Sequence, residues 1–170
     1  TQAEQDKLLR RLREIPGMVL RTSLIAGYPG ETEADVDELE QWIREIRFDR
    51  LGVFAYSPEP GTPAGDREDQ VPEEEREARR DRLMEAQQKI HGKKMNEMVG
   101  QTLNVLVDGI SPEHELITEG RYYGQAPEVD GKVYLSYEYC DRDVANTGEF
   151  VEVEIVEASE YDLVGRVLDA

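Results

Sequence analysis

The chain has 170 residues, of which 38% are hydrophobic and 34% are charged, a composition typical of a soluble folded protein with one or two domains. No apolar run approaches the roughly 18 residues of a membrane span, and no signal peptide is visible. We therefore expect a cytoplasmic protein that makes no membrane contact. Cys140 is the only cysteine, which excludes an intrachain disulfide and a cysteine-ligated iron–sulfur cluster held by this chain alone.

The net charge of −18 is unevenly distributed along the chain. Residues 1–99 have a net charge of −6, whereas residues 100–170 hold 16 acidic and 4 basic residues, a net charge of −12. Such a field repels phosphate backbones and attracts basic proteins. Solubility or adaptation to salt explains the total net charge equally well. Neither explains why the C-terminal part is so poor in Lys and Arg. We expect a monomer with a basic protein partner and no direct nucleic-acid binding.

The N-terminal part alternates between helix and strand. Apolar residues at helical spacing predict a helix over Gln2–Ile15. A strand over Met18–Ala26 is followed by Thr32 and Asp35, which have the spacing of a capping box at the start of a second helix. The next strand, Leu51–Tyr56, is nearly continuous in apolar residues, as in strands covered on both faces. A strand–helix–strand of this length predicts a parallel crossover, as in α/β folds.

A long charged helix is expected from Pro72 to about Val99, lying on a surface between two domains because its apolar positions are sparse. After it the hydrophobic period changes to two, which predicts short strands separated by turns. The five expected strands are Thr102–Val107, Glu119–Tyr123, Lys132–Tyr137, Phe150–Ile155 and Leu163–Leu168. Five antiparallel strands in so short a segment predict a small closed barrel of the oligonucleotide-binding type. The expected domains are residues 1–70, a connecting helix over 71–99, and residues 100–170.

Both N-terminal strands end in turns rich in Gly and Pro, the position at which α/β barrels hold substrates and cofactors. Gly27 and Gly30 lie between the first strand and the second helix. Free amides at that helix end would suit an anion or the polar edge of a cofactor, and Glu31 is placed to accept hydrogen bonds from a ligand. The same spacing also fits an ordinary turn before a capped helix.

Other polar residues are candidates for binding. Arg21 interrupts an apolar strand, and a buried guanidinium needs a partner, either a carboxylate of the barrel or one of a ligand. Tyr56 and Ser57 offer an aromatic face and a hydroxyl to a base, although core packing explains Tyr56 equally well. His91 and His114 have no second His or Cys at ligand spacing, so we expect no metal site in this chain.

Several segments together resemble the radical SAM methylthiotransferase family. GYPGET (27–32) and FDRLGVFAYSPEPGTPA (48–64) resemble its fifth and sixth strand region, and VPEEEREARRDRLMEAQQKI (71–90) resembles the helix that follows. Residues 100–170 resemble the appended TRAM domain. The implied fold is the C-terminal part of a radical SAM partial TIM-type barrel, followed by a five-stranded TRAM barrel.

Two further segments, GRYYGQAPEVDGKVYL (120–135) and EYDLVG (160–165), resemble the family members that modify a ribosomal protein. The first rival is a tRNA methylthiotransferase of the MiaB type, whose TRAM domain should be basic enough to hold phosphates. The second rival is a non-catalytic acidic protein-binding module.

The resemblance implies a reaction for the intact enzyme. A 4Fe-4S cluster held by a CxxxCxxC motif binds S-adenosylmethionine and cleaves it to a 5′-deoxyadenosyl radical. The radical abstracts a hydrogen from the β-carbon of an aspartate on the small-subunit ribosomal protein S-twelve. A second 4Fe-4S cluster helps to deliver the sulfur of the methylthio group. Neither set of cysteines is in this chain, which opens without Met, so we expect a piece that is inactive alone and holds no catalytic residue.

Two groups of site residues follow from the resemblance. The first group would line the adenosine end of S-adenosylmethionine, with the arginine as a further candidate in the lumen: Ile25, Gly27, Tyr56, Ser57 and Arg21. The second group is an acidic and aromatic surface of the TRAM-like part that would contact the basic protein substrate: Tyr122, Tyr123, Glu128 and Asp130.

Overall fold

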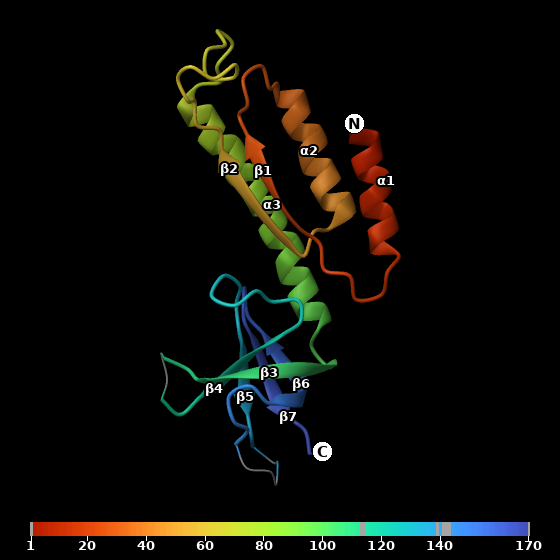
Figure 1. The fold of residues 1–170 in the computed structure, drawn as a ribbon. Coiled ribbons are helices and arrows are strands. Elements are labelled where there is room, and N and C mark those ends of the chain that lie inside the picture. The colour runs from red at the N-terminus through yellow and green to blue at the C-terminus, as the bar shows by residue number, and fades with distance from the viewer. Residues whose placement is uncertain (1, 113–114, 139, 141–143, 170) are drawn as a thin grey trace. The chain divides into compact units, whose positions relative to one another are not determined.

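The computed structural model describes all residues except 1, 113–114, 139, 141–143 and 170. It divides into two compact units, residues 1–91 and residues 92–170 (Figure 1). The first unit contains α1 (Gln2–Arg13), β1 (Arg21–Ala26), α2 (Glu33–Ile46), β2 (Arg50–Ala55) and most of α3 (Glu73–Glu97). The second contains β3 (Thr102–Ile110), β4 (Thr118–Tyr122), β5 (Val133–Ser136), β6 (Phe150–Ala158) and β7 (Leu163–Val167). Within the described residues, no helix combines the length and the apolar character needed to span a membrane.

β1 and β2 form a parallel pair, which confirms the crossover expected from the sequence. Their register runs from Arg21 opposite Arg50 to Ala26 opposite Ala55, and α2 connects them. β1 begins three residues later than expected, because the Met18 amide donates to the carbonyl oxygen of Ile15 at 3.1 Å and closes a turn there.

α2 begins with the expected capping box. The Thr32 amide donates to the Asp35 carboxylate at 2.8 Å, and the Asp35 amide donates to the Thr32 hydroxyl at 3.3 Å. Two amides that the helix itself cannot satisfy thereby gain partners. The helix ends at Arg47, whose φ of 54° turns the chain so that Phe48 is buried against Trp42.

The two faces of the β1–β2 pair differ in their surroundings. One face packs against the helices: Leu51 and Val53 of β2 are buried in one cluster with Ile43 of α2 and Leu83 of α3. On the other face Ile25 is 57% exposed and Phe54 is 61% exposed. The expectation that β2 is covered on both faces is therefore wrong for this chain, because no described element of the chain packs on that side.

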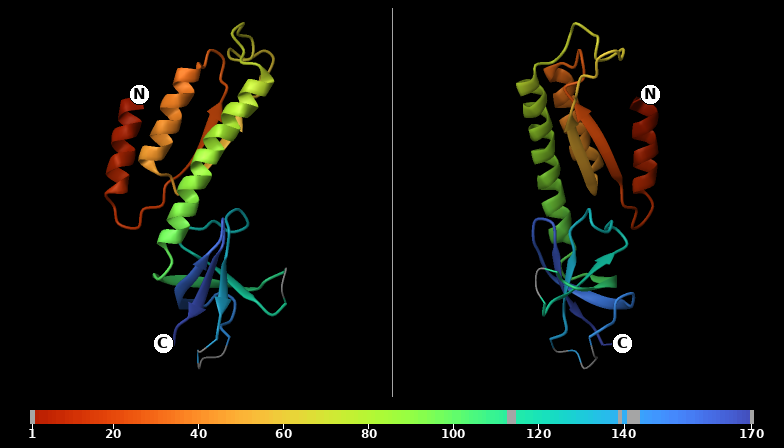
Figure 2. Two further views of the ribbon diagram at one scale, coloured as in Figure 1. Left: turned by 180° about the vertical axis from the view of Figure 1, so that it is seen from behind. Right: turned by 60° about the vertical axis from the view of Figure 1, so that its left-hand side comes forward.

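The second unit is the expected closed barrel (Figure 2). Its strands follow the order β3-β4-β5-β7-β6 around the ring. Four neighbouring pairs are antiparallel, but β5 and β7 are parallel. The expectation of an entirely antiparallel barrel is wrong for a simple reason: a closed ring with an odd number of strands cannot alternate direction at every step, so at least one pair must be parallel.

The barrel core consists mostly of β-branched residues, which suit a pleated inner surface. Val105, Val133, Val151 and Val153 are at most 1% exposed. Gly165 of β7 allows the close packing of this core, since a Cβ there would overlap the side chain of Val153. Met95, near the end of α3, is buried in the same cluster.

Candidate functional site

The carboxyl ends of β1 and β2 bring together four of the residues predicted to bind a cofactor. Ile25 lies opposite Phe54 in the parallel register. The Tyr56 amide donates to the carbonyl oxygen of Ala26 at 2.8 Å, which sets Tyr56 and the exposed Ser57 beside Gly27. The ring of Tyr56 contacts that of Tyr28 edge-on, with centroids 5.3 Å apart. The result is an aromatic and apolar rim next to an open sheet face.

Arg21 does not join this group. It lies opposite Arg50 at the amino end of β1, about 16 Å from the carboxyl end at the rise of an extended strand. It shares the open face with Ile25, four residues further along, because side chains alternate between the faces of a strand. Its side chain is exposed, so the expectation of a buried guanidinium is wrong: the covering layer that would bury it is not formed by the described residues of this chain.

The turn after β1 differs from the expected anion site, because the amides of both its glycines already have partners. The Gly27 amide donates to the Glu31 carboxylate at 2.8 Å, and the Gly30 amide donates to the carbonyl oxygen of Asp69 at 2.9 Å. Asp35 accepts from the Thr32 amide in the capping box. The expectation of free amides is therefore wrong for Gly27 and Gly30, and the Glu31 carboxylate already accepts a hydrogen bond within the chain. The turn serves to position the strand ends.

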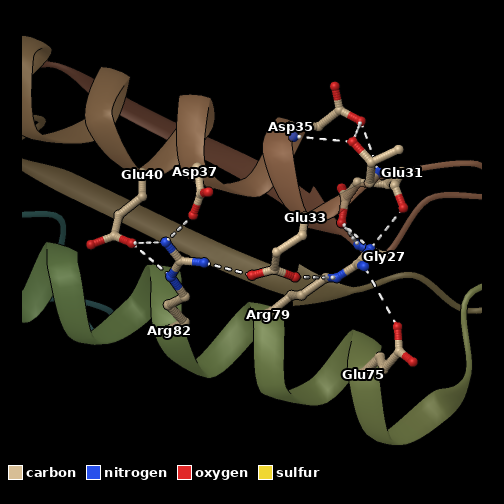
Figure 3. A network of polar contacts seen from close by, with 10 residues as sticks. Gly27, Glu31, Glu33, Asp35, Asp37, Glu40, Glu75, Arg79 and Arg82 are labelled. Atoms are coloured by element: carbon tan, nitrogen blue, oxygen red, sulfur yellow. Dashed lines mark hydrogen bonds and ion pairs between the residues drawn. The ribbon is translucent and has the colours of Figure 1, made fainter.

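Arg79 and Arg82 of α3 hold this turn and the start of α2 (Figure 3), and a third arginine of α3 contacts the end of β2. Arg79 donates to both the backbone oxygen and the carboxylate of Glu31. Arg82 pairs with Glu33, Asp37 and Glu40 of α2 at 2.5–2.7 Å. Arg76, which is not drawn, donates to the carbonyl oxygen of Tyr56 at 2.6 Å. The charged helix that the sequence indicated therefore donates hydrogen bonds to the residues that follow both strands and holds them in place.

The residues predicted to contact a protein substrate lie at the end of β4 and in the loop that follows. Tyr123 is 75% exposed, whereas Tyr122 is 9% exposed and belongs to the barrel core. The two rings meet edge-on with centroids 5.7 Å apart. Glu128 is exposed and has a φ of 63°, which is unusual for a residue with a side chain. Asp130 accepts a hydrogen bond from the Ala126 amide at 2.7 Å, which closes the loop.

Glu128 and Asp130 line a cavity of about 290 Å³, together with residues that sequence reasoning missed. Glu119 is 9% exposed and pairs with Lys132 at 2.7 Å, and Arg121 pairs with Asp108. The sequence feature that points to them is the alternation along β4, where the charged Glu119 and Arg121 flank Gly120. That alternation marks a strand whose outer face is charged.

The sequence assigns no binding site to the two histidines and the cysteine, and the structure describes the surroundings of His91 and Cys140. His91 is 8% exposed, with Nδ1 3.1 Å from Nη1 of Arg50. The Cys140 thiol donates to the Asp169 carboxylate at 3.0 Å. His114 lies outside the described residues. In the described part of the chain, no three His, Cys, Asp or Glu side chains are grouped closely enough to hold a metal ion.

The barrel and its sequence define the class of the second unit: residues 99–168 match the TRAM domain family. Over nearly its whole length the chain is similar to proteins named ribosomal protein uS12 methylthiotransferase RimO. It is 52% identical to that of an Anaeromyxobacter species over 95% of this chain and 34% of the relative. It is 47% identical to that of Myxococcus xanthus over 95% of this chain and 33% of the relative. It is 43% identical to that of Geobacter sulfurreducens over 99% of this chain and 37% of the relative.

The resemblance to the methylthiotransferases that the sequence motifs indicated is thereby confirmed, as is the TRAM barrel. The chain spans about a third of the length of the relatives it matches.

Proposed function

We propose that this chain is the C-terminal part of a radical SAM methylthiotransferase that adds a methylthio group to the β-carbon of an aspartate on ribosomal protein uS12. The proposal is carried by the similarity to proteins with that name over at least 95% of this chain. The methylthio group would come from chemistry in the rest of the protein. This chain would contribute one side of the cofactor pocket and the substrate-docking TRAM domain.

The cofactor side of the proposal rests on the open face at the carboxyl ends of β1 and β2. Ile25 and Phe54 expose apolar side chains there, next to the Tyr56 ring. An adenine ring binds favourably to apolar and aromatic surfaces of this kind. Ile25, Gly27, Tyr56 and Ser57 would hold the adenosine end of S-adenosylmethionine.

Arg21 would act differently from that group. Its distance from the strand ends favours contact with another part of the ligand or with a further strand.

The proposed enzyme also needs two 4Fe-4S clusters. Each is held by several cysteine thiolates, and this chain contains one cysteine, so the cluster ligands would lie outside it. When bound, a cluster supplies the electron that cleaves S-adenosylmethionine. The residues of this chain would bind and orient the cofactor's far end. Alone, the chain would be inactive.

Charge favours a protein substrate over tRNA. The 71 residues from Gly100 onward have a net charge of −12, and such a domain repels a phosphate backbone, whereas a basic ribosomal protein is attracted to it. The exposed Tyr123 and Glu128 suit a protein contact of this kind. A tRNA methylthiotransferase remains the alternative for the barrel strands, and a non-catalytic acidic module for the chain taken alone.

The test uses the longer protein that carries this chain, reconstituted with its clusters under anaerobic conditions and supplied with S-adenosylmethionine. We expect mass spectrometry to find a methylthio group on one aspartate of uS12 and none on tRNA. Modification of tRNA alone would establish the alternative.

In the same assay, Ile25→Asp is expected to raise the KM for S-adenosylmethionine, since it places a charge on the open face. The matched control is Glu38→Asp, an exposed position on α2. An unchanged KM for Ile25→Asp would remove the strand ends from the cofactor site.

A further inference from the structure

We propose that an apolar groove of the barrel unit binds a large apolar side chain of a basic protein segment, with lysines or arginines on either side of that side chain. The groove has a volume of about 660 Å³. It is bounded by β5, by the first residues of β4 and β7, and by the loops that precede β4 and follow β5. The inference deepens the proposed function and rests on it for the identity of the partner, because it places a contact that would select the protein substrate.

The floor of the groove is a part of the sheet that turns apolar side chains away from the core. Tyr134 of β5 lies opposite Val164 of β7 in the parallel register. The residues next to them along the strands, Leu135 and Leu163, belong to the barrel core. Tyr134 and Val164 therefore face outward, because side chains alternate between the two faces of a strand. An aromatic ring and a branched aliphatic side chain thus lie side by side on the outside of the barrel, and both line the groove.

The walls of the groove are apolar as well. Leu116 is 100% exposed and Val144 is 60% exposed, and both residues line the groove. Water contacts these side chains over most of their surface, so covering them with apolar atoms is favourable. Contiguous apolar surface that remains exposed marks a site of interaction with another molecule.

Hydrogen bonds hold both walls in place. The Ser111 amide donates to the carbonyl oxygen of Ile117 at 2.7 Å, next to Leu116. The Ala145 amide, next to Val144, donates to the hydroxyl of Tyr137 at 3.2 Å. A site whose shape is fixed in advance loses little entropy on binding.

The size of the groove suits a side chain of a protein. Pockets that bury compact ligands have volumes of about 300–1,000 Å³, and the groove lies within that range. It has room for a leucine or phenylalanine side chain together with the backbone that carries it.

Acidic side chains surround this apolar surface. Among the described residues that line the groove, Glu138 is the one with a charge. Glu115 directly precedes Leu116 in the chain, and Glu157 of β6 lies opposite Val164 in the antiparallel register. All three glutamates are exposed, and within the described part of the chain no cation pairs with any of them. The surroundings of the groove therefore attract cationic groups.

The basic residues of the same strands do not offset this charge. Lys132, just before β5, pairs with Glu119 at 2.7 Å. Arg166 of β7 pairs with Glu154 of β6. Each of these cations already has a carboxylate of its own, so the three glutamates around the groove keep their negative charge.

The charge decides which molecule occupies the groove. A second copy of the chain brings a net charge of −18 and is repelled. RNA is repelled as well, because its backbone carries a negative charge at every phosphate. A basic protein segment is attracted, and it can insert an apolar side chain into the groove while its lysines or arginines lie next to the glutamates.

The test titrates a five-residue peptide, with leucine at its centre and two lysines on each side, into the 170-residue chain. The ionic strength is kept constant, and the backbone amide NMR signals of Ser136 and Val164 are followed. We expect both signals to shift. Serine in place of the central leucine should weaken the affinity about tenfold, because it removes the apolar side chain. Glutamates in place of the four lysines should weaken it at least about tenfold.

Two variants of the chain locate the binding site. Leu116→Ser is expected to weaken the affinity for the leucine peptide about fivefold, without affecting the fold because Leu116 is fully exposed. Phe150→Ser is the matched control, since Phe150 is an apolar residue of β6 that is 64% exposed and does not line the groove. Glu138→Gln should weaken the affinity about threefold. Its control is Glu152→Gln, which removes the same charge from an exposed position of β6 outside the groove.

Three results would overturn the proposal. An equal loss of affinity in Leu116→Ser and Phe150→Ser would show that the peptide binds elsewhere. Equal affinity for the leucine and serine peptides would show attraction by net charge alone. A single-stranded RNA of ten nucleotides that shifts the same two signals would overturn the assignment to a protein.

The outcome separates this inference from the proposed function. If the leucine peptide binds in the groove and uS12 is not modified by the longer protein, the groove stands and the proposed substrate is wrong. If uS12 is modified and the peptide shifts neither Ser136 nor Val164, the groove inference is wrong and the proposed function stands.

Discussion

Arg79 donates to Glu31 twice, to the backbone carbonyl oxygen at 2.9 Å and to the carboxylate at 3.1 Å. The same carboxylate accepts from the Gly27 amide. Arg79 thereby joins α3 to the turn at the end of β1. Both charged side chains are nearly buried, at 11% and 13% exposed, so neither is well solvated without the other.

Arg79→Ala is expected to lower the free energy of unfolding of the first unit by about 3 kcal/mol, because it leaves the Glu31 carboxylate buried without its cation. Arg80→Ala is the control: Arg80 pairs with the exposed Asp81 and should cost less than about 0.5 kcal/mol. Urea unfolding followed by the fluorescence of Trp42, the only tryptophan, measures both. Equal effects would mean that the Arg79–Glu31 pair does not stabilise the turn.

Gly27→Ala tests the close approach of α3 to the same turn. Gly27 has a φ of +78°, and a Cβ there would overlap the Arg76 side chain. Gly61 has nearly the same φ, +80°, with open space around it, so Gly61→Ala measures the backbone cost alone, about 1–2 kcal/mol. We expect Gly27→Ala to cost at least about 1 kcal/mol more, from the clash. The difference between the two variants in the free energy of unfolding, measured by urea unfolding, gives the cost of the steric clash.

Glu40 is expected to make the stability of the first unit depend on pH. A hydrogen bond from Arg44, aided by Arg82, lowers the pKa of Glu40 below its ordinary value of 4.5. Because the folded state has the lower pKa, the stabilisation is complete above pH 4.5 and is lost as the pH falls through the folded pKa.

The measurement is the urea midpoint of the wild type and of Glu40→Gln across this range of pH. The two midpoints should differ at neutral pH and converge in acid. A difference that stays constant down to the acid limit would contradict the expectation.

Gln125→Ala is expected to destabilise the barrel unit by about 2 kcal/mol, since it leaves the Tyr122 amide and the Gly131 carbonyl oxygen without their partner. Asn104→Ala, at an exposed position of β3, is the control and should change the midpoint little. Equal midpoints for Gln125→Ala and Asn104→Ala would show that the loop keeps its shape without these two hydrogen bonds.

The elements of the fold could be predicted because their signals are local. The capping box of Thr32 and Asp35, the period of two after Gln101 and the strand–helix–strand spacing depend on neighbours in the sequence. The parallel pairing of β5 with β7 was missed, although the number of strands requires a parallel pair somewhere in a closed ring. The period of a strand carries no information about the direction of its neighbour.

The candidate site was predicted only in part, because its contacts join distant residues. The turn sequence predicts that Glu31 is available to a ligand, but Arg79, 48 residues away, donates a hydrogen bond to its carboxylate. The apolar strand predicts that Arg21 is buried, yet Arg21 is exposed on the uncovered face. Glu119 gave no signal as a site residue, since its burial arises from a loop that returns over β4. Residue types indicate which chemistry is possible, but tertiary contacts determine which polar groups are buried or already hydrogen-bonded.

The two-stranded sheet of the first unit has a practical consequence for handling this protein. With only β1 and β2 in that sheet, each strand has one long side with no strand beside it among the described residues. Rows of amide and carbonyl groups of this kind recruit further strands, including those of other copies. The exposed Ile25 and Phe54 add an apolar surface that favours association. Concentrated solutions of the 170-residue chain taken alone are therefore expected to self-associate through the first unit, and a dilution series should accompany every binding measurement made with it.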